Sequence, residues 1–316
     1  MSGIEPDRIV SALSSSYAAA ATLTQGKNAD YIPFLAGVPS GLFGLAIVTV
    51  DGQIYEHGDA RHEFAVESIS KVLTLAAAIE EVGPEQLRAK VGADPTGMPF
   101  NSVTALELHD DRPLSPLVNA GAMATVSLLT ATNAEDRWTK ILAMQSRLAG
   151  RAIHISDEVN TSEQTTNFHN RAIAWLLYSG GNMFCDPMEA CDVYTRQCST
   201  LVTAVDLAVI GATLANGGIN PVTQERVLQA DNVPPILAEM MMEGLYDTSG
   251  DWAFQVGLPA KSGVGGGLVA VAPGKLAIAG FAPPLDPVGN SVKAQAAVAA
   301  VAKTLGLNLF HGSLCS

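Results

Sequence analysis

The sequence predicts a mixed α/β fold of the α+β type, in which a mostly antiparallel sheet is flanked by helices and is joined to a helical subdomain. Two observations support this prediction. Strand-like runs of small apolar and β-branched residues occur near both ends of the chain, whereas the long segment between them has a helical pattern. To form one sheet, the strands near the N-terminus must pair with those near the C-terminus. The helical segment between them is therefore expected to be an insertion in the sheet-containing part.

The N-terminal part combines one helix with a strand pair. Residues 7–24 are rich in Ser and Ala and predict a helix, and residues 44–50 predict a buried strand. Asp51-Gly52 is a typical two-residue hairpin turn, which leads into a second strand from Gln53. A largely apolar helix then starts near Ser68, and Gly83-Pro84 ends it.

The middle of the chain, to about residue 247, is mostly helical in pattern, and the C-terminal part returns to strands. Residues 267–272 and 275–281 predict two strands joined by a turn at Pro273-Gly274, and a final helix is expected over residues 291–305. The helices predicted in between cover residues 119–132, 134–149, 169–179, 187–197, 203–215 and 233–243.

Composition excludes several classes of function. With 48% hydrophobic and 16% charged residues in 316, the chain is long and apolar enough for a large globular core. A formal charge of −13 argues against binding to nucleic acid or to an anionic membrane. The longest apolar stretch, residues 263–285, contains Lys275, Pro273 and several glycines, so it is a poor membrane span.

The N-terminus and the cysteines indicate a cytoplasmic protein without a metal. Residues 1–8 contain no basic segment followed by an apolar one, so no secretory signal is expected. No C-x-x-C pair and no histidine at zinc-ligand spacing occurs, which predicts free thiols and neither a metal site nor another cofactor. The four cysteines are Cys185, Cys191, Cys198 and Cys315.

The strongest chemical signal is the pair Ser68 and Lys71 at the start of an apolar helix. Three residues of separation place both side chains on one helix face, one turn apart. The positive end of the helix dipole and the apolar surroundings both disfavour the charged form of Lys71, so its amine can accept the Ser68 proton. This arrangement is typical of acyl transfer through a serine nucleophile. Taken alone, a serine at this position is more often only a helix N-cap.

A second signal lies far downstream, where Lys261-Ser262-Gly263 precedes Val264, three glycines and a strand. A Ser-x-x-Lys motif with a later Lys-Thr-Gly motif is the signature of serine β-lactamases and penicillin-binding proteins, and Lys261-Ser262-Gly263 is similar to the second of these motifs. Gly263 allows the backbone to approach a substrate closely, so the N–H groups of Ser68 and Val264 are expected to form an oxyanion hole. Lys261 is expected to support the cleft electrostatically.

Read together, these and further motifs resemble the serine-dependent glutaminases of the β-lactamase/DD-peptidase-like fold, in their compact bacterial form. The resemblance covers nearly the whole chain in order, and it implies one catalytic unit over residues 1–316. Within it, residues 1–64 and 248–316 would form the sheet-containing subdomain and residues 65–247 the mainly helical one. The matching segments are residues 29–33, 64–71, 100–102, 118–122, 162–163, 170–172, 193–199, 214–218, 244–247, 257–264 and 289–292.

The resemblance also implies a substrate, L-glutamine, and a role for each site residue. Ser68 would attack the side-chain amide with Lys71 as general base, and Tyr194 or Tyr246 would assist proton transfer at the leaving nitrogen. Glu163 would bind the α-ammonium group. The amides of Asn119 and Asn170 would hydrogen-bond the backbone end of the substrate. The pocket would be lined by Tyr31, Tyr194 and Tyr246. The resemblance also implies that the protein is a homodimer or a homotetramer.

Two other classes of function compete with this interpretation. A β-lactamase or penicillin-binding protein carries Ser-Asp-Asn or Tyr-x-Asn between its two lysine motifs. Here Ser156-Asp157 is followed by Glu158, and Tyr194 is followed by Thr195-Arg196. A non-catalytic ligand-binding domain of the same fold is the second alternative, and the intact pair of Ser68 and Lys71 argues against it.

Overall fold

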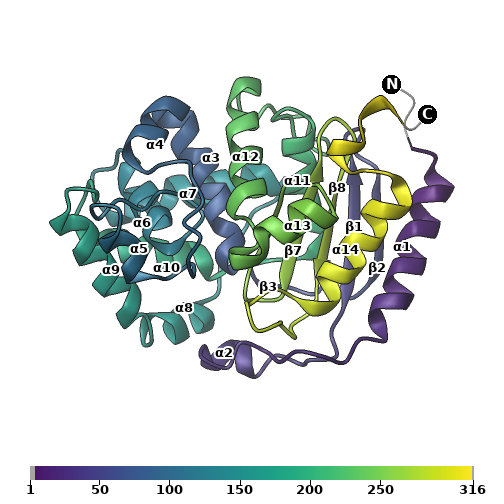
Figure 1. Cartoon of the computed structure of the whole chain (residues 1–316), viewed down its shortest axis with the longest axis horizontal. Coiled ribbons are helices and arrows are strands. Elements are labelled where there is room, and N and C mark those ends of the chain that lie inside the picture. Colours follow the sequence, from purple (N-terminus) through teal and green to yellow (C-terminus); the bar gives the residue numbers. More distant parts are fainter. Residues whose placement is uncertain (1–3, 315–316) are drawn as a thin grey trace.

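A five-stranded antiparallel sheet with strand order β2-β1-β8-β7-β6 lies in the right-hand half of the computed structural model in Figure 1, and the structure describes residues 4–314. Residues 44–49 pair with residues 276–281, so the first strand of the chain lies directly beside the last. The mostly antiparallel sheet predicted from the two ends of the sequence is therefore confirmed. The strands are β1 (Gly44–Thr49), β2 (Ile54–Gly58), β6 (Ala260–Ser262), β7 (Gly267–Ala272) and β8 (Leu276–Phe281).

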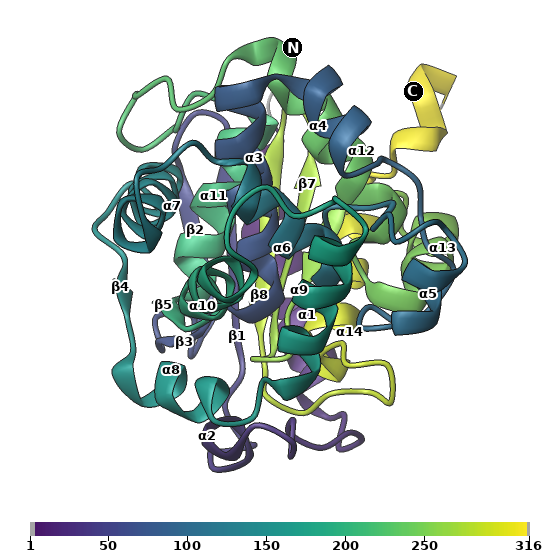
Figure 2. The same ribbon diagram turned by 90° about the vertical axis from the view of Figure 1, so that its left-hand side faces the viewer.

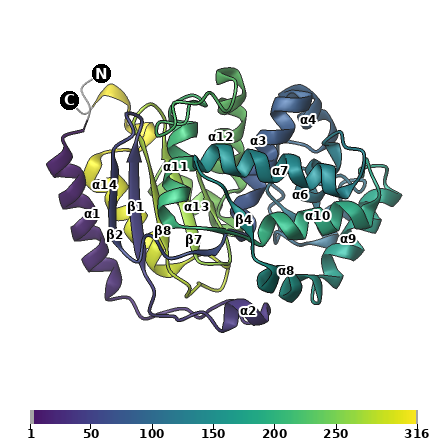
Figure 3. The ribbon, with the colours of Figure 1, turned by 180° about the vertical axis from the view of Figure 1, so that it is seen from behind.

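Helices cover both faces of this sheet, because successive side chains of its central strands point to opposite sides. Leu45 and Ile47 of β1 pack with α1 (Pro6–Ala21) and α14 (Val292–Leu305). Ala46 and Val48 pack on the other side with α11 (Ala204–Ala215), all of whose residues are buried (Figures 1 and 3). A Cβ atom at Gly211 of α11 would lie 2.6 Å from Ala277 Cβ, so this glycine permits the helix to lie close to the sheet.

The helical region beside the sheet, which faces the viewer in Figure 2, is built around α3. Most residues of α3 are buried, and it packs against α6, α7 and α12. Gly83 ends α3 with φ +81°, and Pro84 begins α4. The helices of this region and its connections are α2 (Pro33–Ala36), α3 (Ser70–Val82), α4 (Pro84–Lys90), α5 (Val103–Glu107), α6 (Asn119–Leu128), α7 (Ala134–Ala149), α8 (Asp157–Gln164), α9 (Phe168–Ser179), α10 (Pro187–Cys198), α12 (Val233–Glu243) and α13 (Ser249–Gln255).

A small three-stranded sheet, β3 (Phe64–Ala65), β5 (Thr200–Val202) and β4 (His154–Ile155), connects the helical region to the segment before Ser68. The backbone N–H of Val66 extends this pairing by donating to Thr200 O at 2.9 Å. The turn that carries Ser68 is consequently fixed to the end of α10. The sequence analysis did not predict this sheet.

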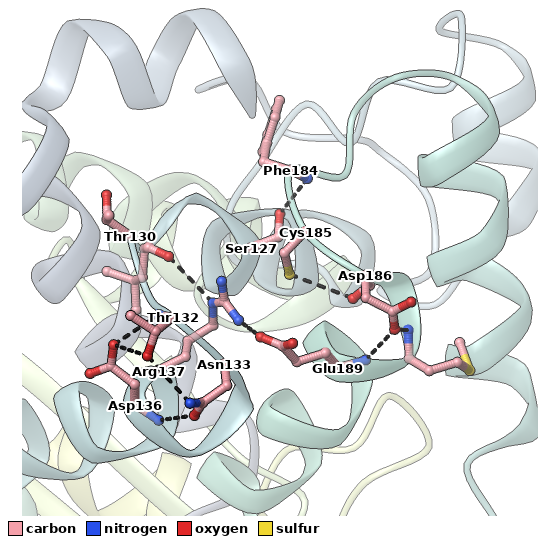
Figure 4. A network of polar contacts seen from close by, with 12 residues as sticks. Ser127, Thr130, Thr132, Asn133, Asp136, Arg137, Phe184, Cys185, Asp186 and Glu189 are labelled. Carbon is pink, nitrogen blue, oxygen red and sulfur yellow. Dashed lines mark hydrogen bonds and ion pairs between the residues drawn. The ribbon is translucent and has the colours of Figure 1, made fainter.

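A buried ion pair between Arg137 of α7 and Glu189 of α10 holds these two helices together (Figure 4). Both helices begin with a side-chain cap. Asn133 Oδ1 accepts from the Asp136 N–H, and Asp186 Oδ1 accepts from the N–H groups at the start of α10. Since α10 also carries Tyr194, this network contributes to the position of a predicted site residue.

Two predicted helices end earlier than expected. The helix predicted over residues 119–132 ends at Leu128, because Leu129 is extended and the Thr130 N–H donates to Glu81 Oε1 instead of continuing the helix. The helix predicted over residues 7–24 ends at Ala21. The three described cysteines form no disulfide, whereas Cys315 and the first three residues lie outside the described part of the chain. Between residues 4 and 314, no helix is long and apolar enough to cross a membrane.

Candidate active site

Ser68 and Lys71 lie at the junction between a short 3₁₀ turn (Glu67–Ile69) and α3. The apolar residues that follow draw α3 into the core, so both side chains are buried, with 8% of Ser68 and 1% of Lys71 exposed. A lysine this deeply buried is unusual unless its amine has partners or is uncharged. The local fold therefore places a hydroxyl and an unusual amine one helical turn apart.

The amine of Lys71 donates a hydrogen bond of 2.7 Å to Asn119 Oδ1. Asn119 is the first residue of α6, so its side chain reaches Lys71 from a neighbouring helix. Burial lowers the pKa of Lys71 to about 8, and nearby acidic groups offset only part of this effect. A substantial fraction of the Lys71 amine is therefore neutral near physiological pH and can accept a proton.

Asn119 also connects Lys71 to two further predicted residues. Its Oδ1 accepts a second hydrogen bond from Tyr194 OH at 3.1 Å, and its Nδ2 donates to Asn170 Oδ1 at 3.0 Å. Burial raises the pKa of Tyr194 well above its usual value, so its phenol is a neutral hydrogen-bond donor. Side chains from α3, α6, α9 and α10 thus meet in one polar network.

Tyr246 lies in a short 3₁₀ turn (Tyr246–Thr248) and is buried. Its backbone has φ +54°, a left-handed conformation that is uncommon for a bulky residue, and its phenol donates to Ser262 O at 3.4 Å. Burial raises the pKa of Tyr246, which keeps the phenol neutral. Among the described residues, no hydrogen bond joins Ser68 Oγ to Lys71 Nζ.

Lys261 lies on β6 behind Tyr246 and is fully buried. Its Nζ donates to Gly244 O at 3.0 Å and to Ser262 O at 2.8 Å, and it lies 4.5 Å from the centre of the Tyr246 ring. Burial lowers the pKa of Lys261 well below its usual value. One acceptor, Gly244 O, lies two residues before Tyr246, and the other, Ser262 O, also accepts from Tyr246 OH at 3.4 Å, so Lys261 and Tyr246 share an acceptor.

The turn after β6 lies against the Ser68 backbone. A Cβ atom at Gly263 would lie 2.8 Å from Val66 O and 3.3 Å from Ser68 N, and one at Gly265 would lie 2.2 Å from Ala65 O. Only glycine allows this approach. Neither the Ser68 N–H nor the Val264 N–H donates to another residue within the described chain. Two free backbone donors thus come from adjacent segments, as an oxyanion hole requires.

Comparison with known proteins identifies the family. The family model described as Glutaminase matches residues 26–310. A glutaminase of Mycobacterium ulcerans is 70% identical over 286 residues, which cover 90% of this chain and 89% of that protein. Glutaminase 1 of Shigella flexneri is 64% identical over 309 residues, 98% of this chain and all of that protein.

This chain belongs to the glutaminase family. A solved structure described as the probable glutaminase ybaS superposes with a TM-score of 0.97 at 64% identity, and the match covers 98% of this chain and all of that one. The family and the serine β-lactamase-like glutaminase fold predicted from the sequence are therefore confirmed. The assignment of substrate contacts to single residues stays a prediction.

Glu163 and Tyr31 complete the set of glutaminase residues that the sequence singled out. Glu163 lies on α8, and its Oε1 is buried and receives no hydrogen bond from another described residue. Tyr31 lies in the loop before α2 with 57% of its surface exposed, so it lies at the rim of the cleft rather than in its depth. It is near enough to Glu163 and Tyr246 to interact with them electrostatically.

One acidic residue of the site was missed. Glu67 directly precedes Ser68, is 3% exposed and has φ +50°. Its Oε1 is buried and has no hydrogen-bond partner among the described residues. The signal that could have revealed it was a charged residue within the buried apolar run from Phe64 to Ile69. Within residues 4–314, no group of three or more His, Cys, Asp or Glu side chains is arranged to hold a metal ion.

Proposed function

We propose that this protein is an L-glutamine amidohydrolase, which converts L-glutamine to L-glutamate and ammonia through an acyl-enzyme on Ser68. The observation that carries the proposal is the buried Lys71, with a pKa of about 8, one helical turn from Ser68. It supports the proposal in a chain that matches the glutaminase family over residues 26–310 and is 64% to 70% identical to curated glutaminases.

In the first half-reaction, Ser68 Oγ attacks the carbon of the substrate's side-chain amide and its proton passes to the neutral Lys71 amine. The amide oxygen becomes negatively charged and accepts hydrogen bonds from the Ser68 and Val264 N–H groups. The carbon–nitrogen bond then breaks, and the proton returns to the leaving nitrogen to give ammonia. Tyr194 or Tyr246 is proposed to assist this proton transfer, since Tyr194 OH shares the acceptor Asn119 Oδ1 with Lys71 Nζ and Tyr246 is buried in the same region.

In the second half-reaction, water attacks the γ-glutamyl ester. Lys71 accepts the proton of this water and returns it to Ser68 Oγ as the ester bond breaks, which releases glutamate and restores the hydroxyl. No step needs a metal ion or another cofactor. Activity is therefore expected to survive treatment with a chelator, and a loss reversed by one particular metal would contradict the proposal.

The polar ends of the substrate need partners of opposite character. Glu163 supplies a carboxylate for the α-ammonium group. Asn119 and Asn170 supply amide donors for the α-carboxylate, since each Nδ2 carries two protons and the Asn119–Asn170 contact uses only one of Asn119's. An amide with no α-amino group should therefore be a poor substrate of the wild type. Equal rates with this amide and L-glutamine would contradict the Glu163 assignment.

The decisive experiment measures ammonia release from L-glutamine and L-asparagine, and the absorbance change of a chromogenic β-lactam. Turnover of L-glutamine is expected, whereas preferential turnover of the β-lactam would favour the penicillin-binding class. Ser68→Ala should abolish turnover, and Lys71→Ala should reduce it by at least about two orders of magnitude. Mass spectrometry after acid quenching should place the γ-glutamyl ester on Ser68 and not on the neighbouring Ser70. L-glutamine binding without turnover by a folded wild type would indicate a non-catalytic binding domain.

The protein is further proposed to act in the cytoplasm as a homodimer or homotetramer, as the family resemblance suggests. Light scattering coupled to size exclusion distinguishes these two states from a monomer of 32.8 kDa.

A further inference from the structure

We propose that the hydroxyl of Ser70, held in place by Gln197, orients the backbone N–H of Ser68 toward the oxyanion of the substrate. Ser70 lies between the proposed nucleophile and its proposed base, and no step of the proposed reaction uses its side chain. The inference rests on the proposed function, since an oxyanion forms only if Ser68 attacks the substrate amide. Ser70 and Gln197 are thus assigned as positioning residues that act through the backbone of the nucleophile.

The first observation concerns the peptide bond between Glu67 and Ser68. The hydroxyl of Ser70 donates a hydrogen bond of 2.7 Å to Glu67 O, and the N–H of Ser70 donates to the same oxygen. The C=O and N–H groups of a trans peptide bond lie in one plane and point in opposite directions. A hydrogen bond that fixes Glu67 O therefore also sets the direction of the Ser68 N–H.

The N–H side of this peptide bond faces the turn after β6. A Cβ atom at Gly263 would lie 3.3 Å from Ser68 N, and the next residue, Val264, carries the second proposed oxyanion donor. Ser70 contacts the carbonyl oxygen, on the opposite side of the same peptide bond. One rigid peptide unit thus connects a buried hydroxyl to the proposed oxyanion hole.

The conformation of Glu67 explains why this peptide unit needs support. Its φ of +50° is left-handed, which is unfavourable for a residue with a side chain and persists only where the surroundings fix it. Glu67 also lies in a 3₁₀ turn, in which the backbone hydrogen bonds have poorer geometry than those of an α-helix. The hydroxyl of Ser70 gives Glu67 O a second donor and so restricts the rotation of the carbonyl group.

Gln197 of α10 determines where the hydroxyl proton of Ser70 points. Its Nε2 donates to Ser70 Oγ at 3.3 Å, and its Oε1 accepts from Thr74 Oγ1 at 2.6 Å, one turn further along α3. Because Glu67 O can only accept, the single hydroxyl proton of Ser70 goes to that oxygen and a lone pair of Ser70 Oγ faces Gln197. Ser70, Thr74 and Gln197 are each at most 1% exposed, so bulk water does not compete for these hydrogen bonds. Hydrogen bonds that follow one another in this way strengthen each other.

The experiment is a double-mutant cycle on Ser70 and Gln197. Ser70→Ala should lower kcat for L-glutamine by about tenfold or more, since loss of a whole oxyanion donor costs about 10² to 10³ in kcat. Its KM should stay within about threefold of the wild type, because the oxyanion exists only after attack. Gln197→Leu should lower kcat by about threefold to fivefold, on the scale of one neutral hydrogen bond.

The double variant distinguishes a linked pair from two separate effects. Because Gln197 is proposed to act only through Ser70, the double variant should lose no more kcat than Ser70→Ala alone. A double variant whose loss is the product of the two single losses would overturn the proposal. A wild-type kcat in either single variant would overturn it as well.

Ser127→Ala is the matched control for the loss of a buried hydroxyl. Ser127 of α6 is buried, and its hydroxyl donates to Ala124 O at 2.7 Å, three residues earlier, as Ser70 does to its own acceptor. It also accepts one hydrogen bond, from the Phe184 N–H (Figure 4). Thermal denaturation should show a similar loss of stability in Ser127→Ala and Ser70→Ala, whereas kcat of Ser127→Ala should stay near that of the wild type. An equal loss of kcat in both variants would overturn the proposal.

A binding measurement does not depend on turnover. In a glutamine analogue with a boronic acid in place of the side-chain amide, boron accepts an electron pair from Ser68 Oγ and the serine proton passes to Lys71. The tetrahedral anion that forms has an oxygen in the oxyanion position, so its dissociation constant should rise in Ser70→Ala by about the factor by which kcat falls. L-Norvaline has the same ammonium, carboxylate and carbon chain but no such oxygen, and its binding should not change.

Equal weakening of both ligands would overturn the proposal, because it would mean that Ser70 supports the pocket as a whole. Failure of the proposed function itself would look different, since the wild type would then release no ammonia from L-glutamine.

Discussion

Asn119 Oδ1 lies 2.7 Å from Lys71 Nζ and accepts the hydrogen bond that the lysine donates. The oxygen of an amide carries a partial charge, not a full one, so it stabilises the protonated amine less than a carboxylate would. Burial therefore remains the main influence on the lysine, and its pKa stays near 8. This contact determines the pH range in which the proposed reaction can proceed.

The pH profile of the wild type follows from this pKa. Lys71 accepts a proton only when it is neutral, and it is mostly charged below pH 8. The value of kcat/KM should therefore rise with pH, with a midpoint at about 8. Steady-state kinetics across this range would check the prediction, and a flat profile from mildly acidic to alkaline pH would contradict it. Lys71→Arg is the matched control. Arginine cannot lose its proton, so the reaction rate of this variant should be at least about a hundredfold lower than that of the wild type.

Asn119→Asp should move that midpoint upward. A carboxylate at the position of the amide oxygen favours the charged form of Lys71, which raises the pKa of the lysine. The rising part of the kcat/KM profile should consequently move to higher pH than in the wild type. Aspartate cannot donate to Asn170 Oδ1 as Asn119 does, so the absolute rate should also fall, but this loss does not affect the position of the midpoint. An unchanged midpoint would mean that another group is responsible for the pH dependence.

Lys261→Met should lower kcat more than it raises KM. Methionine fills a similar volume, but it leaves Gly244 O and Ser262 O without the hydrogen bonds that position Tyr246. We expect a decrease in kcat of at least about tenfold, on the scale of one to a few kcal/mol for unpaired buried carbonyl groups. Because Lys71 is untouched, the midpoint of the pH profile should stay near 8. A variant with wild-type kcat would show that Lys261 has no positioning role.

Glu239→Gln should stabilise the protein at alkaline pH without affecting the site. Glu239 of α12 is 5% exposed and accepts a hydrogen bond from Ser115 Oγ, and burial raises its pKa from 4.5 to about 7. The folded state therefore binds the proton more tightly than the unfolded state, so stability is lost as pH rises from 4.5 to 7. The glutamine variant avoids this loss. Its advantage in the free energy of unfolding should reach about 3 kcal/mol at most above pH 7 and disappear below pH 4.5.

Chemical denaturation of Glu239→Gln and the wild type at several pH values checks that prediction. Ser115→Ala is the control, since it removes the donor but leaves the carboxyl group. An advantage independent of pH would mean that the stability change comes from packing and not from ionisation.

The sequence was sufficient to predict the elements with strong periodicity and the residues with a recognisable spacing. The strand from Gly44, the strands on either side of Pro273-Gly274 and the helix over residues 134–149 follow from local pattern alone. The pair Ser68 and Lys71 follows from helix geometry, because residues one turn apart share a face. These features depend on neighbours in the chain, and a single sequence contains that information.

Features that depend on distant partners could not be found in the same way. The strands Phe64–Ala65 and His154–Ile155 are too short to produce an alternating pattern, and only their pairing with Thr200–Val202 makes them strands. The burial of Glu67 depends on the turn after β6, which packs against its side chain from far away in the sequence. The sequence analysis expected Asn119 to contact substrate, and nothing local indicated that its oxygen binds Lys71.

The pairing of β1 with β8 has a consequence for the order of events during synthesis. The helix with Ser68 and Lys71 leaves the ribosome long before Val264. The strand β1 can pair early with β2, but it cannot gain its second neighbour, β8, until residues 276–281 have been made. Pairing between segments so far apart in sequence is slow, because the loop between them must be closed first. A nascent chain therefore carries the proposed nucleophile, Ser68, without the proposed oxyanion donor, the Val264 N–H. Amide hydrolysis can begin only after translation has passed the last strand.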